Sequence, residues 1–82
     1  MASVESLVQR MRDLADKNGV PSNVSEMLEE ASQYLEDEEK DLSVRVNSAS
    51  SILDEISNDP NIKQHTRTEI WNLASKVESL ND

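Results

Sequence analysis

The sequence predicts an all-α protein, a four-helix bundle built from two helical hairpins in tandem. Apolar residues recur at steps of three and four along four segments of the 82-residue chain, which is the period of an amphipathic helix. Turn signals, Asn-Gly-Val-Pro at 18–21 and Asp-Pro-Asn at 59–61, interrupt the first and second pairs of segments. We therefore expect a single helical domain over residues 1–82, with hairpin one at 3–36 and hairpin two at 42–80.

A shift of 42 residues lays the apolar positions of one hairpin on those of the other along their whole length. This agreement favours a degenerate internal duplication. A period near 42 also suits stacked two-helix repeats, but two units are too few to stabilise such an array. A closed bundle with short loops and antiparallel neighbours is the better expectation.

Hairpin one begins with an N-cap at Ser3. The expected buried positions of the first helix are Val4, Leu7, Val8, Met11, Leu14 and Ala15. This helix should end before Gly19, because glycine adopts a positive φ without strain. Ser22 or Asn23 is expected to open the second helix, with Asn23 and Glu26 spaced as a capping box.

Hairpin two follows a charged run at 36–41, which we expect to end the second helix because carboxylates are unfavourable at a helix C-terminus. Asp41 is the expected cap of the third helix. After the turn at 59–61, Thr66 and Glu69 have the spacing of a capping box and predict the start of the fourth helix. The expected buried positions are Leu42, Val46, Ala49, Ile52, Leu53, Ile56, Ile70, Leu73, Ala74, Val77 and Leu80.

Composition restricts the partners of the chain. Seventeen acidic residues against eight basic ones give a formal net charge of −9. The basic residues are scattered, so direct binding to nucleic acid or to an anionic membrane is disfavoured, whereas a basic protein partner is compatible with this charge. The chain has no cysteine and no apolar run near the roughly 20 residues that span a bilayer. We expect a cytoplasmic protein without a cofactor.

Residues that could carry catalysis are few. His65 is the only histidine and lies four residues before Glu69, so the pair can share one helical face. An imidazole and a carboxylate can hold a metal or relay a proton, but two ligands are too few for a tight site. The many serines have only this one imidazole as a partner, and the single glycine excludes a phosphate-binding loop. We predict no catalytic and no metal-binding residues.

Trp71 is the most informative candidate for a partner contact. It follows the expected core residue Ile70 and lies four residues after Arg67, whose guanidinium can stack over the indole. Two interpretations stay open at this point: a tryptophan at the edge of the core shielded by Arg67, or an anchor for a partner, since Trp, Tyr and Arg dominate interface hot spots. Arg45 and Tyr34 can extend such a contact surface.

Hairpin two also carries a long motif. It consists of EDEEKDL at 36–42, VRV at 44–46, ILDEISNDPN at 52–61, HTRT at 65–68 and IWN at 70–72. This motif resembles the signature of a small uncharacterised family of archaeal proteins, closely over residues 36–77 and in pattern only over the first helix. The resemblance implies a small all-helical protein and no established activity.

The function that best fits these observations is a non-enzymatic protein-interaction or scaffolding module, self-association included, with Arg45, Arg67 and Trp71 as contact residues. One alternative is an accessory protein of the ribosome or of nucleic acid that acts through a protein contact. Another is a weak metal-assisted activity at His65 and Glu69.

Overall fold

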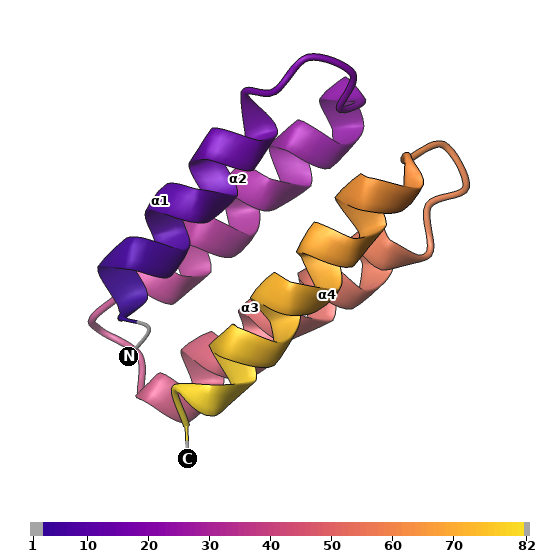
Figure 1. Ribbon diagram of the computed structural model, residues 1–82. Coiled ribbons are helices and arrows are strands. Elements are labelled where there is room, and N and C mark those ends of the chain that lie inside the picture. The colour runs from indigo at the N-terminus through magenta and orange to yellow at the C-terminus, as the bar shows by residue number, and fades with distance from the viewer. Residues whose placement is uncertain (1–2, 82) are drawn as a thin grey trace.

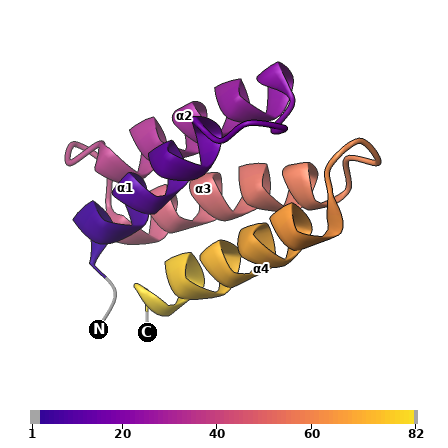
Figure 2. The ribbon, with the colours of Figure 1, turned by 45° about the horizontal axis from the view of Figure 1, so that its top comes forward.

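The computed structural model describes residues 3–81, which form an antiparallel bundle of helices (Figure 1). The elements are α1 (Val4–Ala15), α2 (Ser22–Glu36), α3 (Leu42–Ser57) and α4 (Gln64–Ser79). Helices α1 and α2 form hairpin one, and α3 and α4 form hairpin two beside it (Figures 1 and 2). The predicted all-α bundle of two hairpins is confirmed.

The core is aliphatic, as the composition requires. Its fully buried large side chains include Leu7, Met11, Leu14, Val24, Leu28, Leu35, Leu53, Ile56, Ile70, Leu73 and Val77. The accessible surface is 5025 Å², close to the about 4,900 Å² expected for a free monomer of this mass. The radius of gyration, 11.7 Å, also matches a compact chain of this length. A second copy is therefore not needed to complete the core.

The start of α1 follows the sequence prediction. The Ser6 amide donates to the Ser3 hydroxyl at 3.1 Å, and the Ser3 amide donates to the Ser6 hydroxyl at the same distance. This reciprocal pair satisfies backbone donors that the first helical turn leaves open. After α1 ends, Gly19 adopts φ +90°, which is the conformation for which glycine is favoured.

The start of α2 agrees with the prediction in position but not in its cap. The helix begins at Ser22, and the N-cap position is held by Pro21 in an extended conformation without a side-chain hydrogen bond. Asn23 therefore lies inside the first turn and does not form a capping box with Glu26. Its side-chain amide instead donates to the carboxylate of Asp59 at 3.3 Å, which links the two inter-helix loops.

The predicted capping box of α4 is wrong. The helix begins at Gln64 with Lys63 at the N-cap, because the chain enters the helix directly after Ile62, which is only 6% exposed in the core. Thr66 is consequently a buried residue of the first turn, and Glu69 pairs with α1 instead of capping α4. In α3, Asp41 holds the N-cap position as expected, but its side chain makes no capping hydrogen bond.

The helix boundaries on either side of the turn within each hairpin repeat at the offset of the apolar pattern. Helices α1 and α3 end at Ala15 and Ser57, and α2 and α4 begin at Ser22 and Gln64; both pairs are 42 residues apart. Consecutive helices pack closely, whereas α1 and α4, the first and last, contact each other least. None of the helices in the described part of the chain combines the length and apolar character needed to cross a membrane.

Candidate functional site

The most exposed large apolar side chain on the described helices is Trp71, at 53%. It lies in the middle of α4, directly after Ile70, which is fully buried. The other exposed large apolar residues are Val44 on α3, at 48%, and Tyr34 on α2, at 44%. Trp71 therefore leaves about half of its surface in water, although it is anchored next to the core.

Trp71 lies on the side of α4 that borders α3. Arg67 reaches the last residue of α3, Ser57, from this side of α4, and Trp71 follows it by one helical turn. Ser50 lies seven residues, about two turns, before Ser57 and so belongs to the α4-facing side of α3. The indole and the middle of α3 thus share the outer face of hairpin two.

This outer face carries no charge at its centre. Charged residues make up 30% of the chain, yet none occurs at 46–53 on α3 or at 70–75 on α4. Asp54 and Glu78 lie at its two ends. We call the uncharged centre the Trp71 face; its exposed residues are Asn47, Ser51, Thr68, Trp71 and Ser75. The side chains around the indole are small, so another surface can approach it closely.

Arg67 stabilises the connection between α3 and α4. Its Nε donates to the carbonyl oxygen of Ser57 and its Nη2 to that of Asp59, both at 2.9 Å. Its Nη1 also contacts the side-chain oxygen of Gln64 at 3.4 Å. The guanidinium is therefore directed toward the start of α4, away from Trp71, and each of its three nitrogens already donates a hydrogen bond within the chain.

Arg45 lies on the opposite side of α3, toward α2. Its Nη1 donates to the carbonyl oxygen of Leu35 at 3.3 Å, and its buried Nε has no hydrogen-bond partner among the described residues. It borders a pocket of about 320 Å³ whose other lining residues are Val4, Glu5, Glu36 and Glu38. The three candidate contact residues are thus not brought together, and only Trp71 presents a free side chain on the outer face of hairpin two.

Arg12 of α1 forms salt bridges with two carboxylates of α2. Arg12 donates to Glu29 through Nε and Nη2, both at 3.1 Å, and to Glu36 through Nη2 at 2.7 Å. The hydrogen bonds from Arg12 lower the pKa of Glu29, and the two carboxylates raise the pKa of Arg12 further above its usual range. All three side chains are partly solvated, so this cluster serves structure and offers no base of unusual strength.

Among the described residues, no third ligand joins the His65 and Glu69 pair. His65 is exposed in the first turn of α4, and Glu69 accepts from Lys17 on α1 at 3.3 Å. Over residues 3–81, no group of three or more His, Asp or Glu side chains is arranged to hold a metal.

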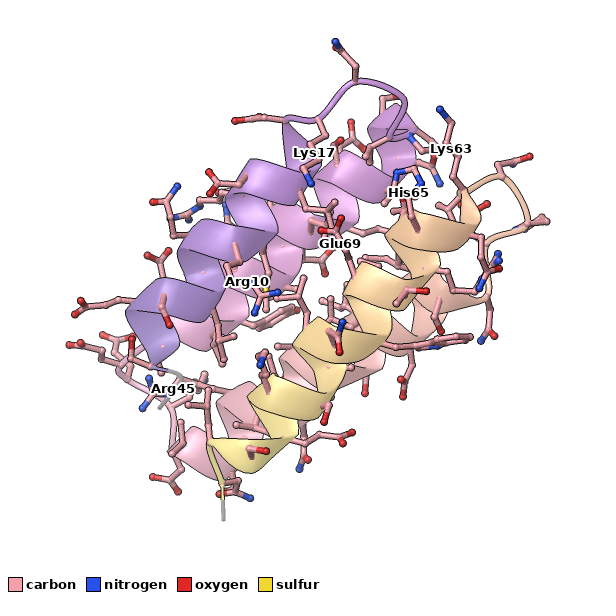
Figure 3. All side chains as sticks on the ribbon, viewed as in Figure 1. Arg10, Lys17, Arg45, Lys63, His65 and Glu69 are labelled. Carbon is pink, nitrogen blue, oxygen red and sulfur yellow. The ribbon has the colours of Figure 1, made fainter. Side chains whose placement is uncertain are left out.

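The fold gathers basic residues that look scattered in the sequence. Figure 3 shows Arg10 and Lys17 on the side of α1 that faces α4, with His65 and Glu69 across from them and Lys63 beyond. Sequence reasoning missed this arrangement, although the seven-residue spacing of Arg10 and Lys17 places both on one helical face.

Over residues 3–81, these features define a small antiparallel four-helix bundle with a half-exposed tryptophan. The chain belongs to the uncharacterised protein family UPF0147, whose family model matches residues 1–80. The predicted resemblance to a small archaeal family of unknown function is thereby confirmed.

Relatives and a solved structure support this assignment. A UPF0147 protein of Methanothermobacter thermautotrophicus is 42% identical over 72 residues, which cover 88% of this chain and 71% of the relative. One from Methanosarcina mazei is 38% identical over 94% of this chain and 83% of its own length. The crystal structure of a UPF0147 protein from Thermoplasma acidophilum matches with a TM-score of 0.87 and 32% identity, over 93% of this chain and 89% of that chain.

Proposed function

We propose that this protein is a non-enzymatic protein-binding module that contacts its partner through the Trp71 face. The observation that supports the proposal is the half-exposed indole of Trp71 on a surface without charge at its centre. The cores of protein interfaces are depleted of charged residues and enriched in aromatic ones. The Trp71 face has both properties in a chain that is otherwise highly charged.

The free energy available at this face can be estimated from Trp71. A tryptophan buries about 150–250 Å², so covering the exposed half removes roughly 100 Å² of mostly apolar surface from water. At about 25 cal/mol per Å² this contributes about 2.5 kcal/mol to binding, which is the size of a typical hot spot. The small neighbouring side chains lose little conformational entropy when they are covered.

The chemistry of the face indicates the kind of partner. Because the monomer is already compact, the proposal favours a different protein over a second copy. The partner surface should offer an apolar pocket for the indole. Basic or amide groups should surround this pocket, since Asp54 and Glu78 flank the uncharged centre. A ribosomal or other nucleic-acid-bound protein with such a surface would be a partner of this kind.

The test begins with affinity capture from native lysate with the wild-type protein, Trp71→Ala and Tyr34→Ala. Tyr34 is the matched control, because it is a half-exposed aromatic residue on α2 that lies beside the charged residues Glu30 and Asp37 and not on the uncharged Trp71 face. Circular dichroism must first show that all three proteins are folded.

A captured protein is then purified and its dissociation constant measured with each variant. We expect Trp71→Ala to weaken binding by about thirtyfold or more and Tyr34→Ala to leave it unchanged. Equal affinity for all three proteins would contradict the proposal. A monomer–dimer equilibrium in sedimentation that Trp71→Ala abolishes would instead identify a second copy as the occupant.

A further inference from the structure

Cationic side chains gather where α1 and α4 lie side by side, although the whole chain carries a net charge of −9. We call this surface the α1–α4 face; it comprises Arg10, Lys17, His65, Glu69 and Lys76. Both helices lie toward the viewer in Figures 1 and 3. The face is distinct from the Trp71 face, which lies on the other side of α4.

One ion pair shows which residues of α1 and α4 lie opposite each other. Lys17 Nζ lies 3.3 Å from Glu69 Oε1. Arg10 is seven residues before Lys17 and Lys76 is seven residues after Glu69. Because α1 and α4 are antiparallel, Arg10 and Lys76 both lie about 10.5 Å from the ion pair, in the same direction along the bundle.

Two like charges therefore stand opposite each other at this level. Arg10 and Lys76 are both exposed, and neither takes part in an ion pair within residues 3–81. Asp13, the nearest acidic residue of α1, accepts a hydrogen bond from Gln9 at 2.9 Å. Because no ion pair joins either cation to a carboxylate among the described residues, an anionic group placed between them would be attracted by both.

Lys63 extends the cationic surface to the end of the bundle. A Cβ built on Gly19 would lie 3.2 Å from Lys63 Nζ, so this ammonium lies over the loop that follows Lys17. Lys63 is also the N-cap of α4, whose first turn contains no acidic residue. The positive end of the helix dipole is thus not neutralised from within the helix.

From this arrangement we propose that the α1–α4 face binds an acidic α-helix of a partner, with carboxylates spaced one heptad apart. Carboxylates at i and i+7 lie on one side of a helix and about 10.5 Å apart, which matches the spacing of Arg10 and Lys17. Because α1 and α4 contact each other and run antiparallel, a helix laid along them can reach side chains of both. Recognition of one face of an amphipathic helix is a common mode of peptide binding.

Nucleic acid fits this face less well. Sequence-tolerant binding of single strands depends on aromatic side chains that stack on bases. The two aromatic residues of the chain lie elsewhere, Tyr34 on α2 and Trp71 on the α3-facing side of α4. Four cations also give little affinity for a polyanion that the other carboxylates repel.

The experiment is a titration of isotope-labelled protein at low salt, followed by the shifts of backbone amide signals. The probe is an alanine-rich helical peptide with glutamates seven residues apart. A control peptide has the same composition with glutamates five residues apart, which places them on different sides of the helix. We expect the probe to shift amides of α1 and α4 and to bind more tightly than the control peptide.

Variants then test the residues that carry the proposal. Arg10→Gln with Lys76→Gln should weaken binding of the probe by between about twofold and thirtyfold. Lys40→Gln, a control cation in the α2–α3 connection, should not change it. Trp71→Ala should also leave it unchanged, so failure of this inference and failure of the proposed function can be distinguished.

Three results would overturn the inference. The first is equal affinity of the probe for the wild type and the double variant. The second is equal binding of the two peptides, which would indicate unspecific attraction. The third is tighter binding of a single-stranded RNA oligonucleotide than of the probe. Thermal unfolding of the double variant excludes a trivial cause, because removal of two facing like charges should not lower the melting temperature.

Discussion

Replacing Arg67 by methionine tests whether this residue is part of the fold or a partner contact. Methionine keeps much of the side-chain stem but removes the donors to the carbonyl oxygens of Ser57 and Asp59, each 2.9 Å away. The Ser57 carbonyl belongs to the last turn of α3, where no helical amide is available to satisfy it. The α3–α4 connection would therefore lose the group that joins its two ends.

The magnitude follows from the two hydrogen bonds. A hydrogen bond to a charged group contributes about 1.5–3 kcal/mol. Because Arg67 is only partly buried, water can replace part of the loss, and about half of the summed value is a fair expectation. We therefore predict a decrease of about 1.5–3 kcal/mol in the free energy of unfolding, which corresponds to a melting temperature lower by about 6–24 °C.

Urea and thermal unfolding monitored by circular dichroism measure this change. Arg67→Lys is the control for charge: its single ammonium cannot form the same fork of hydrogen bonds, so an intermediate loss is expected. Asn72→Ala, at an exposed position of the same helix, is the control for position and should change the unfolding free energy by less than about 0.5 kcal/mol. The reasoning is refuted if Arg67→Met is as stable as the wild type.

Three further perturbations have defined outcomes. Ser50→Ala should be neutral or stabilising in urea unfolding, because the buried Ser50 hydroxyl has no hydrogen-bond partner among the described residues. Gly19→Ala should lower stability by about 1–2 kcal/mol, since φ is +90° and the new Cβ would press against Lys63; an unchanged urea midpoint would contradict this. Arg12→Gln should destabilise the protein at neutral pH and match the wild type in acid. The pKa of Glu29 is lowered in the fold, so the contribution of the pair is complete above the ordinary glutamate pKa and lost as the pH falls through the lowered value; a gap that persists in acid would exclude the ion pair as its cause.

The helices were predictable because their apolar stripes are strong, whereas the cap of α2 and the start of α4 were not. Thr66 and Glu69 match a capping box in sequence, but burial of Ile62 and Thr66 outweighs that local signal and starts α4 earlier. The internal repeat does predict where α4 begins. The offset of 42 carries the start of α2 at Ser22 onto Gln64, which is where α4 begins.

Less of the two candidate surfaces than of the helices could be predicted from the sequence. Trp71 could be singled out because tryptophan next to a core position is rare, but its exposure depends on the packing of α3 beside it. The pairing of Lys17 with Glu69 joins residues 52 positions apart. It follows only once α1 and α4 are known to be neighbours, and periodicity says which side of a helix is buried but not which helix covers it.

The weak packing between α1 and α4 also bears on how the chain folds. The three close helix pairs are each consecutive in sequence, so they form by closing short loops at small entropic cost. Such local topologies fold in microseconds to milliseconds. The α1–α4 contact joins the two ends of the chain, so it closes last and opens first, and amide hydrogens of the outer helices exchange before those of α2 and α3. A partner helix bound to both α1 and α4 would oppose this opening. Its binding would therefore slow amide hydrogen exchange in both helices.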